Sequence, residues 1–258
     1  EPTKTMKLLC AIITLMLSLY CCLVYAANNS SVFQPWSDKV FIDIRERFGN
    51  EAEQRARHIH QLLLNNQEAS TLKKLELTND TLNYVPWIKD EELWKKADYW
   101  ATPMETLVTY GGDCEDIAIG KYVMLKALGI SEDRLNIAYV LLEPEGLRHM
   151  ILTYDNSVDK TTFNPNNFLV LDNFNRNIMT LGERKDISVV YLFNEDQIDI
   201  AKANENTRIK YANSDKLINQ NGIRDRIIQN RQYYRNINEG RPLFPLENMD
   251  FKLLGSPQ

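Results

Sequence analysis

The spacing of apolar residues changes along the chain, and this change restricts the folds open to it. Apolar side chains recur at close to 3.6-residue intervals over residues 40–65, and helical patterns follow over 70–84 and 114–128. Short runs that favour β-strands come next, separated by turn-forming residues, at 136–142, 150–154, 168–171 and 188–193. Helices followed by strands predict an α+β domain, with N-terminal helices packed on an antiparallel sheet.

The composition is that of a globular protein. Of 258 residues, 44% are apolar and 10% aromatic, which suffices for one sizeable domain with a hydrophobic core. The formal net charge is −5 and the sequence has no basic stripe, which argues against a nucleic-acid partner. Because the chain becomes polar near residue 200, we predict a domain over residues 27–200 and a polar C-terminal extension over 201–258, partly helical near 214–234 or flexible.

The first 26 residues are typical of a secretory signal peptide. Lys4 and Lys7 precede an apolar run over 8–25, which ends in small residues at Ala26 and Ala27. An uncleaved membrane anchor is the rival interpretation, because the run approaches the ~20 residues that span a bilayer. The small residues at its end favour cleavage, so we expect an exported mature chain that does not span the membrane. Cleavage would remove one net positive charge and leave a net charge of −6.

One cysteine remains after the predicted cleavage. Cys10, Cys21 and Cys22 belong to the signal, whereas Cys114 lies in the run Gly111-Gly112-Asp113-Cys114-Glu115-Asp116. A lone thiol in an exported chain has no partner for an internal disulfide, so it is either buried or reactive. The Gly-Gly turn places Cys114 at the start of a predicted helix, where free N–H groups and the helix dipole stabilise a thiolate and can bind an oxyanion.

A thiol nucleophile needs a base, normally a histidine. The mature chain offers His58, His60 and His149. His58 and His60 lie two residues apart on a predicted helix and point to different faces, so we interpret them as surface or packing residues. His149 opens a predicted strand directly after a turn, a position that presents its side chain at a sheet edge. We therefore predict that His149 is the base.

The base in turn needs a polar group to orient it. Asp172 follows the apolar run over 168–171, and adjacent strands would place it beside His149. Asp155 and Asp159 are the competitors, although both fall in an expected hairpin loop. A buried free cysteine with a satisfied core histidine is the alternative that needs no chemistry.

Large aromatic residues gather before Cys114, in an otherwise irregular stretch over 87–109. They are Trp87, Trp94, Tyr99 and Trp100. Core packing is the simplest interpretation, because large aromatic side chains are mostly buried. Alternatively, Trp100 lines a cleft beside Cys114.

Four separated blocks resemble one family. They are Trp100-Ala101-Thr102-Pro103-x-Glu105, Gly111-Gly112-Asp113-Cys114-Glu115-Asp116-x-Ala118-Ile119-x-Lys121-Tyr122, Arg148-His149-Met150 and Leu171-Asp172-Asn173. These blocks are similar to the bacterial transglutaminase-like cysteine proteinases, the LapG family, over residues 33–193. The resemblance implies a transglutaminase-like, papain-like cysteine protease fold with Cys114 as nucleophile, His149 as base and Asp172 as its orienter. The stretch between His149 and Asp172 is longer than is usual for the family.

The acidic residues beside the thiol need an explanation of their own. Carboxylates at Asp113 and Glu115 raise the pKa of a neighbouring thiol through like-charge repulsion, which opposes activation. A bound hard cation would cancel this effect, and carboxylate oxygens are the ligands that calcium prefers. The resemblance implies calcium dependence, with Asp113 and Glu115 as metal ligands and Asp116 and Asp98 as further candidates. Asp113 also suits the N-cap of the predicted helix.

The resemblance also implies a biological role. Members of the family are periplasmic cysteine endopeptidases that cleave the N-terminal region of a large surface adhesin and so promote biofilm dispersal. An inner-membrane cyclic-di-GMP receptor is the expected inhibitory partner. Two alternatives stay open: another acyl-transfer enzyme, such as a transglutaminase or a cell-wall peptide amidase, which needs the same triad, and a non-catalytic binding module on the same fold.

Overall fold

A computed structural model describes residues 33–158, 163–193, 198–200, 209–211 and 223–244. The predicted signal peptide over 1–26 lies outside the described residues, as do Asp159 and part of the helix expected near 214–234. Within these ranges, none of the helices combines the length and apolar character that a membrane crossing requires.

The helical half of the domain agrees with the sequence pattern. The long predicted helix is two helices, because Gly49 adopts φ 90° between them, a conformation that favours glycine. The helices before the sheet are α2 (Asp38–Phe48), α3 (Asn50–Asn65), α4 (Thr71–Asn83), α5 (Asp90–Leu93), α6 (Pro103–Thr109) and α7 (Cys114–Ala127).

The stretch over 87–109, expected to be irregular, contains two short helices. In α6 the Thr102 hydroxyl accepts a hydrogen bond from the Glu105 N–H, and the Glu105 carboxylate accepts one from the Thr102 N–H. This reciprocal cap starts a helix that has too few apolar residues to show a period. Core packing is confirmed for Trp100, which is 8% exposed, but is wrong for Trp87, which is 54% exposed. The backbone of Trp87 bridges Gly112, and its ring faces solvent.

The strands form one antiparallel sheet, as predicted. Neighbouring strands follow the order β4-β3-β2-β1-β5-β6-β7, and each pair of neighbours in this order is antiparallel. Their bounds are β1 (Leu135–Leu142), β2 (Leu147–Asp155), β3 (Phe168–Leu171), β4 (Met179–Thr180), β5 (Ile187–Phe193), β6 (Ile198–Ile200) and β7 (Ile209–Tyr211). Three of these strands, β4, β6 and β7, are too short to show a pattern in the sequence.

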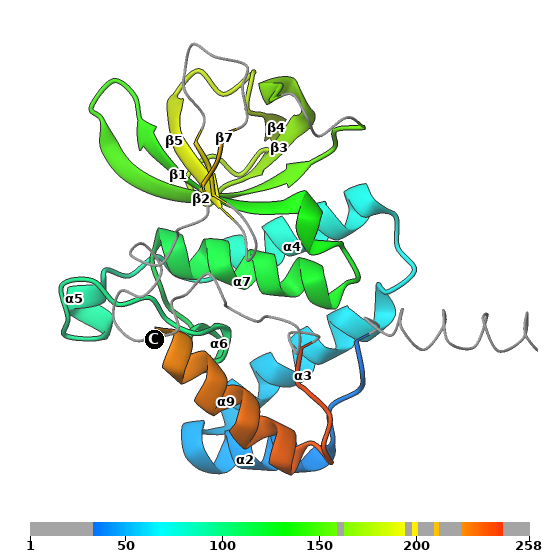
Figure 1. The fold of residues 1–258 in the computed structure, drawn as a ribbon. Helices are drawn as coiled ribbons and strands as arrows, with labels where there is room; N and C mark the ends of the chain where they lie inside the picture. Colours follow the sequence, from blue (N-terminus) through cyan, green and yellow to red (C-terminus); the bar gives the residue numbers. More distant parts are fainter. Residues whose placement is uncertain (1–32, 159–162, 194–197, 201–208, 212–222, 245–258) are drawn as a thin grey trace, which may run out of the picture. The chain divides into compact units, whose positions relative to one another are not determined.

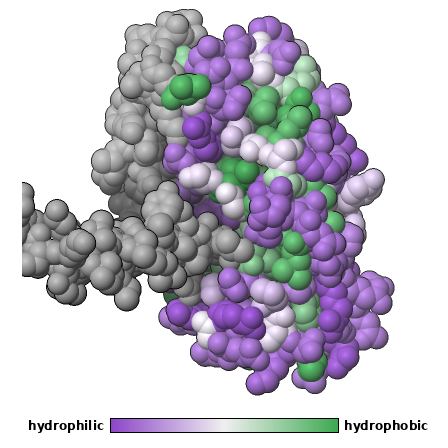
Figure 2. Space-filling model, turned by 90° about the vertical axis from the view of Figure 1, so that its right-hand side faces the viewer, coloured by the Kyte–Doolittle hydropathy of each residue, from purple (hydrophilic) through white to green (hydrophobic). Residues whose placement is uncertain are grey.

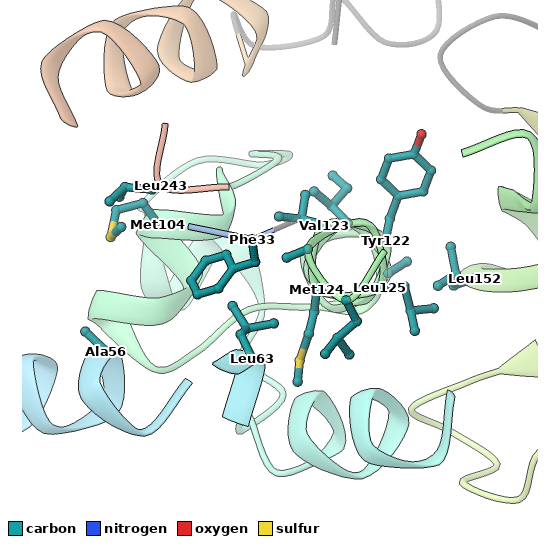
Figure 3. Close-up of a cluster of buried hydrophobic side chains, with 14 of the residues drawn as sticks. Phe33, Ala56, Leu63, Met104, Tyr122, Val123, Met124, Leu125, Leu152 and Leu243 are labelled. Atoms are coloured by element: carbon teal, nitrogen blue, oxygen red, sulfur yellow. The ribbon is translucent and has the colours of Figure 1, made fainter. Parts of the chain in front are cut away.

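Helix α7 is the centre of the fold and packs against strands β1 and β2 and against helices α4 and α6 (Figure 1). Its residues after Cys114 are all buried, which explains why it shows little amphipathic character. Figure 3 shows side chains that radiate from α7 in several directions, among them Val123, Met124 and Leu125, with Leu63 and Leu152 nearby. The thiol at the first residue of α7 is therefore attached to a helix that is buried along its whole remaining length. On the face drawn in Figure 2, apolar residues lie in small separate groups among polar ones.

Part of the predicted extension packs on the helical layer. Helix α9 (Ile223–Ile237) lies beside α2 (Figure 1), and its Tyr234 is buried in the main core. The Asn238 side chain accepts a hydrogen bond from the Ser37 N–H at 2.7 Å, and the Leu243 carbonyl accepts one from the Trp36 indole at 2.6 Å. These contacts anchor the stretch that follows α9.

Candidate active site

Cys114 is the first residue of α7, and Asp113 is its N-cap, as the sequence predicted. The preceding turn needs glycine, because a Cβ atom at Gly112 would lie only 2.8 Å from the Asp116 side chain. The Gly112 N–H donates to the Pro86 carbonyl at 3.3 Å, and its carbonyl accepts from the Ile88 N–H at 3.0 Å. The start of α7 is thus held against a second segment of the chain.

The thiol has two hydrogen-bonded neighbours, and they have opposite effects on its pKa. Cys114 Sγ donates a hydrogen bond to Glu115 Oε2 at 3.2 Å, and the Met150 backbone N–H donates one to the sulfur. Burial, and then the charges of Glu115 and Asp113, raise the pKa of Cys114, while the Met150 N–H lowers it. The lowering expected from the helix end is therefore outweighed, so burial and the two carboxylates favour the thiol over the thiolate when no cation is bound.

His149 lies beside this contact, one residue before Met150 on β2. Its Nε2 atom is 2.7 Å from Asp172 Oδ1, and both side chains are buried. Strands β2 and β3 pair with Leu152 opposite Leu171, which brings the residue after β3 alongside β2. The prediction that adjacent strands bring His149 and Asp172 together is confirmed. Because Nε2 is engaged by Asp172, Nδ1 is the ring nitrogen that can accept the thiol proton.

Asp172 is held as an anion. Burial acts to raise its pKa, but hydrogen bonds from His149, the Phe174 N–H and Arg184 outweigh it and lower the pKa to about 2. The Arg184 guanidinium is fully buried and bridges two carboxylates, at 2.9 Å from Asp172 Oδ2 and 2.7 Å from Asp186 Oδ1. The sequence pattern does not reveal Arg184, because this residue lies in a polar turn and nothing in that turn indicates that its side chain points inward.

Helices α4 and α7 hold the chain that follows β3. Asn83 donates to the Asp172 carbonyl at 2.9 Å, and Asn79 donates to the Arg176 carbonyl at 2.8 Å. Lys121 of α7 in turn donates to the Asn79 side chain at 2.9 Å. Burial lowers the pKa of Lys121 to about 7, although the charge of Asp172 opposes this. The backbone of Asp172 is thus fixed from the helical layer and its side chain from the sheet.

The residues considered as competitors lie elsewhere. The Asp155 carboxylate accepts from the Ser157 N–H at 2.8 Å, six residues beyond His149 and so about 20 Å along the strand. His60 accepts a hydrogen bond from the Trp36 N–H at 3.0 Å within an aromatic cluster, and His58 is exposed. The interpretation of both histidines as surface or packing residues is confirmed.

A group of carboxylates, here called the acidic cluster, surrounds the start of α7. Asp113 and Glu115, the predicted metal ligands, are joined there by Asp98, Asp116 and Asp90. Ligand oxygens lie within 4.8 Å of one another in the set Asp90, Asp113 and Asp116, and again in the set Asp90, Asp98 and Glu115. The sequence pattern does not reveal Asp90, because this residue starts the separate short helix α5 and only the tertiary fold brings it close to α7.

The acidic cluster fits a hard cation. Asp113 Oδ1 and Asp90 Oδ1 are buried without a hydrogen-bond partner among the described residues. Burial, and then the neighbouring carboxylates, raise the pKa of Asp113 to about 10; burial and the charge of Glu115 raise that of Asp116 to about 8. Carboxylates in such a group are costly as anions unless a cation neutralises them, and calcium favours oxygen ligands of this kind.

Comparison with known proteins gives a consistent result. A family model described as bacterial transglutaminase-like cysteine proteinase matches residues 34–199, more than half of the chain. The calcium-bound structure of Legionella pneumophila LapG is 28% identical, with a TM-score of 0.54 over 62% of this chain and 86% of that one. A second LapG structure from this organism is 27% identical, with a TM-score of 0.55 over 65% and 88% of the two chains. No curated protein matches the chain.

An EGTA-treated Legionella pneumophila LapG structure supports the fold alone. It is 24% identical, with a TM-score of 0.59 over 76% of this chain and 99% of that one. The predicted transglutaminase-like α+β fold is therefore confirmed, and so is the coarser prediction of a cysteine proteinase, whose substrate is a protein. The chain belongs to the bacterial transglutaminase-like cysteine proteinases, the LapG family.

Proposed function

We propose that the chain is a calcium-dependent cysteine endopeptidase whose catalytic triad is Cys114, His149 and Asp172. One observation carries this proposal: the thiol accepts a hydrogen bond from the N–H of Met150, the residue after His149, and His149 Nε2 lies 2.7 Å from Asp172 Oδ1. A nucleophile, a base and an orienting acid thus come from three elements to one place.

In the reaction, His149 Nδ1 takes the proton of Cys114, and the Asp172 anion stabilises the resulting imidazolium. The thiolate attacks the scissile carbonyl, and N–H groups at the start of α7 stabilise the oxyanion that forms. When this intermediate collapses, the C–N bond breaks and the leaving amine takes the proton from His149. A water molecule then hydrolyses the thioester with His149 as general base, which restores the thiol.

Calcium is the proposed cofactor, with Asp113 and Glu115 as ligands. Asp90, Asp98 and Asp116 lie close enough to contribute. A bound cation supplies positive charge that offsets the carboxylates beside Cys114 and so favours its thiolate. The relative from Legionella pneumophila is described in a calcium-bound and an EGTA-treated form, which supports this choice of ion.

The proposed biological role follows from the family. The substrate is the N-terminal region of a large surface adhesin, and cleavage releases the adhesin from the cell and promotes biofilm dispersal. The protein acts in the periplasm after removal of residues 1–26, and an inner-membrane cyclic-di-GMP receptor sequesters it. Residues 27–200 are the proposed protease domain and 201–258 its extension.

Incubation of the purified protein with an adhesin N-terminal fragment tests this function. We expect cleavage with calcium, none after chelation by EGTA, and none from the Cys114→Ala variant in either condition. Intact fragment under all conditions would contradict the endopeptidase proposal. Isopeptide cross-links between fragments would indicate a transglutaminase, and turnover of cell-wall peptides alone an amidase. A thiol that fails to react with iodoacetamide at neutral pH would favour a binding module.

A further inference from the structure

Residues 99–102 form a segment without regular secondary structure that contacts both the acidic cluster and helix α9. On one side, the Tyr99 N–H donates to Asp90 Oδ2 at 2.5 Å and the Ala101 N–H donates to Asp116 Oδ1 at 2.6 Å. Two of the backbone N–H groups of the segment therefore fix two carboxylates of the acidic cluster.

The other side of the segment contacts α9. Arg226 donates to the Trp100 carbonyl, its guanidinium lies 4.1 Å from the centre of the Tyr99 ring, and Asn230 donates to the Thr102 hydroxyl at 3.1 Å. Arg226 also lies 3.5 Å from Glu105, the residue that caps α6. Because Arg226 and Asn230 are four residues apart, they share one face of the helix. This face of α9 therefore contacts residues 99–102, the same segment whose backbone N–H groups bond to Asp90 and Asp116.

Helix α9 does not depend on these contacts to stay attached. Tyr234 is buried in the core, and Asn238 and Leu243 bond to Ser37 and Trp36. The helix also lies beyond residues 34–199, which the family model matches. The contacts of Arg226 can therefore be changed without removing the anchor of α9.

We propose that Arg226 is a positioning residue for the acidic cluster. It holds residues 99–102, which fix Asp90 and Asp116, and it thereby sets the affinity of the cluster for calcium. This inference rests on the calcium site of the proposed function. Residues that orient metal ligands typically change metal affinity by about 10- to 100-fold when they are lost. Since Arg226 acts through one intermediate segment, we expect about a tenfold effect.

Calcium titration of the full-length protein by calorimetry tests this role. Arg226→Met is expected to weaken calcium binding about tenfold, whereas Arg226→Lys, which keeps one donor for the Trp100 carbonyl, should recover part of the loss. Arg235→Met is the charge-matched control on α9, because Arg235 is exposed and donates to the nearby Gly240 carbonyl. It should bind calcium like the wild type. The rise in melting temperature on calcium addition gives a second readout. This rise should be smaller in Arg226→Met than in the wild type, and unchanged in Arg235→Met.

Distinct outcomes separate the possibilities. A lower melting temperature with unchanged calcium affinity in Arg226→Met would make the contact merely structural and overturn the inference. An equal loss in Arg235→Met would assign the effect to net charge and also overturn it. If Arg226→Met does not fold, Asn230→Ala replaces it, with an expected loss of about two- to threefold, and unchanged affinity there rejects the role. A wild-type chain that does not bind calcium would overturn both this inference and the proposed metal site.

Discussion

Two buried carboxylates of the site, Asp172 and Asp116, have pKa values that are shifted in opposite directions. The pKa of Asp172 falls to about 2, because His149, a backbone N–H and Arg184 outweigh its burial. The pKa of Asp116 rises to about 8, because burial and the charge of Glu115 outweigh its backbone hydrogen bonds. Burial is common to both, so the difference lies in the partners that the fold supplies.

The contrast shows which carboxylates of the site have all the partners that stabilise their charge within the chain itself. Asp172 has cationic and N–H partners from β2, the turn after β3 and the turn before β5. The acidic cluster instead brings carboxylates together, and two of its buried oxygens lack a partner among the described residues. The first arrangement suits a permanent anion. The second suits a group that requires an added cation to ionise.

The largest effect is expected from removal of the Asp172 charge. In Asp172→Asn, the amide cannot stabilise the imidazolium of His149 and its NH₂ group meets Arg184, so kcat should fall on the order of 10³-fold or more. Saturating calcium should not restore activity, since this side of the site does not depend on the cation. Cleavage kinetics at varied calcium concentrations check this, and substantial rescue by calcium would show that the two groups are one coupled unit.

A smaller loss, about 100-fold at limiting calcium, is expected from Glu115→Gln. The variant removes one proposed ligand but leaves the triad intact, so high calcium should recover part of the activity. Glu91→Gln is the matched control, because Glu91 is an exposed acid on α5 next to Asp90. Cleavage rates and calcium titration measure both variants. If Glu115→Gln and Glu91→Gln behave alike, the acidic cluster is not the metal site.

The stability of the calcium-free protein should fall as the pH rises. The pKa of Asp113 and Asp116 in the folded state lies above the ordinary value of 3.8, so the stability they contribute is complete below about pH 4. That stability is lost progressively as the pH rises from about 4 towards 8. Urea unfolding in EGTA at pH 5 and pH 8 measures this difference. The difference in unfolding free energy between pH 5 and pH 8 should be smaller in Asp113→Asn, and smaller in the wild type when calcium is present. A free energy of unfolding that rises equally with pH in the wild type in EGTA, in the variant and with calcium would contradict the assignment of raised pKa values to these carboxyl groups.

The same contrast explains what the sequence could predict. Helix α7, the β-hairpin and the pairing of His149 with Asp172 follow from apolar periods and strand order, which are local properties. Arg184 and Asp90 could not be found in this way, because each comes from a short turn with no period. The short strands β6 and β7 and the contact of α9 with residues 99–102 likewise depend on tertiary packing. The sequence therefore predicted the thiol and its two partners better than the groups that tune them.

The smallest effect on activity is expected from Asp155→Asn. Asp155 is as buried as Asp172 and lies on the strand that carries His149, so the variant removes a buried charge from the same sheet. Its carboxylate accepts the Ser157 N–H about 20 Å along β2 from His149, a role that an asparagine oxygen can retain. We expect a stability loss of about 1 kcal/mol and cleavage rates within about twofold of wild type. A loss of activity close to that of Asp172→Asn would mean that any buried charge on this sheet disturbs the site, and the distinction between an oriented triad and general electrostatics would then fail.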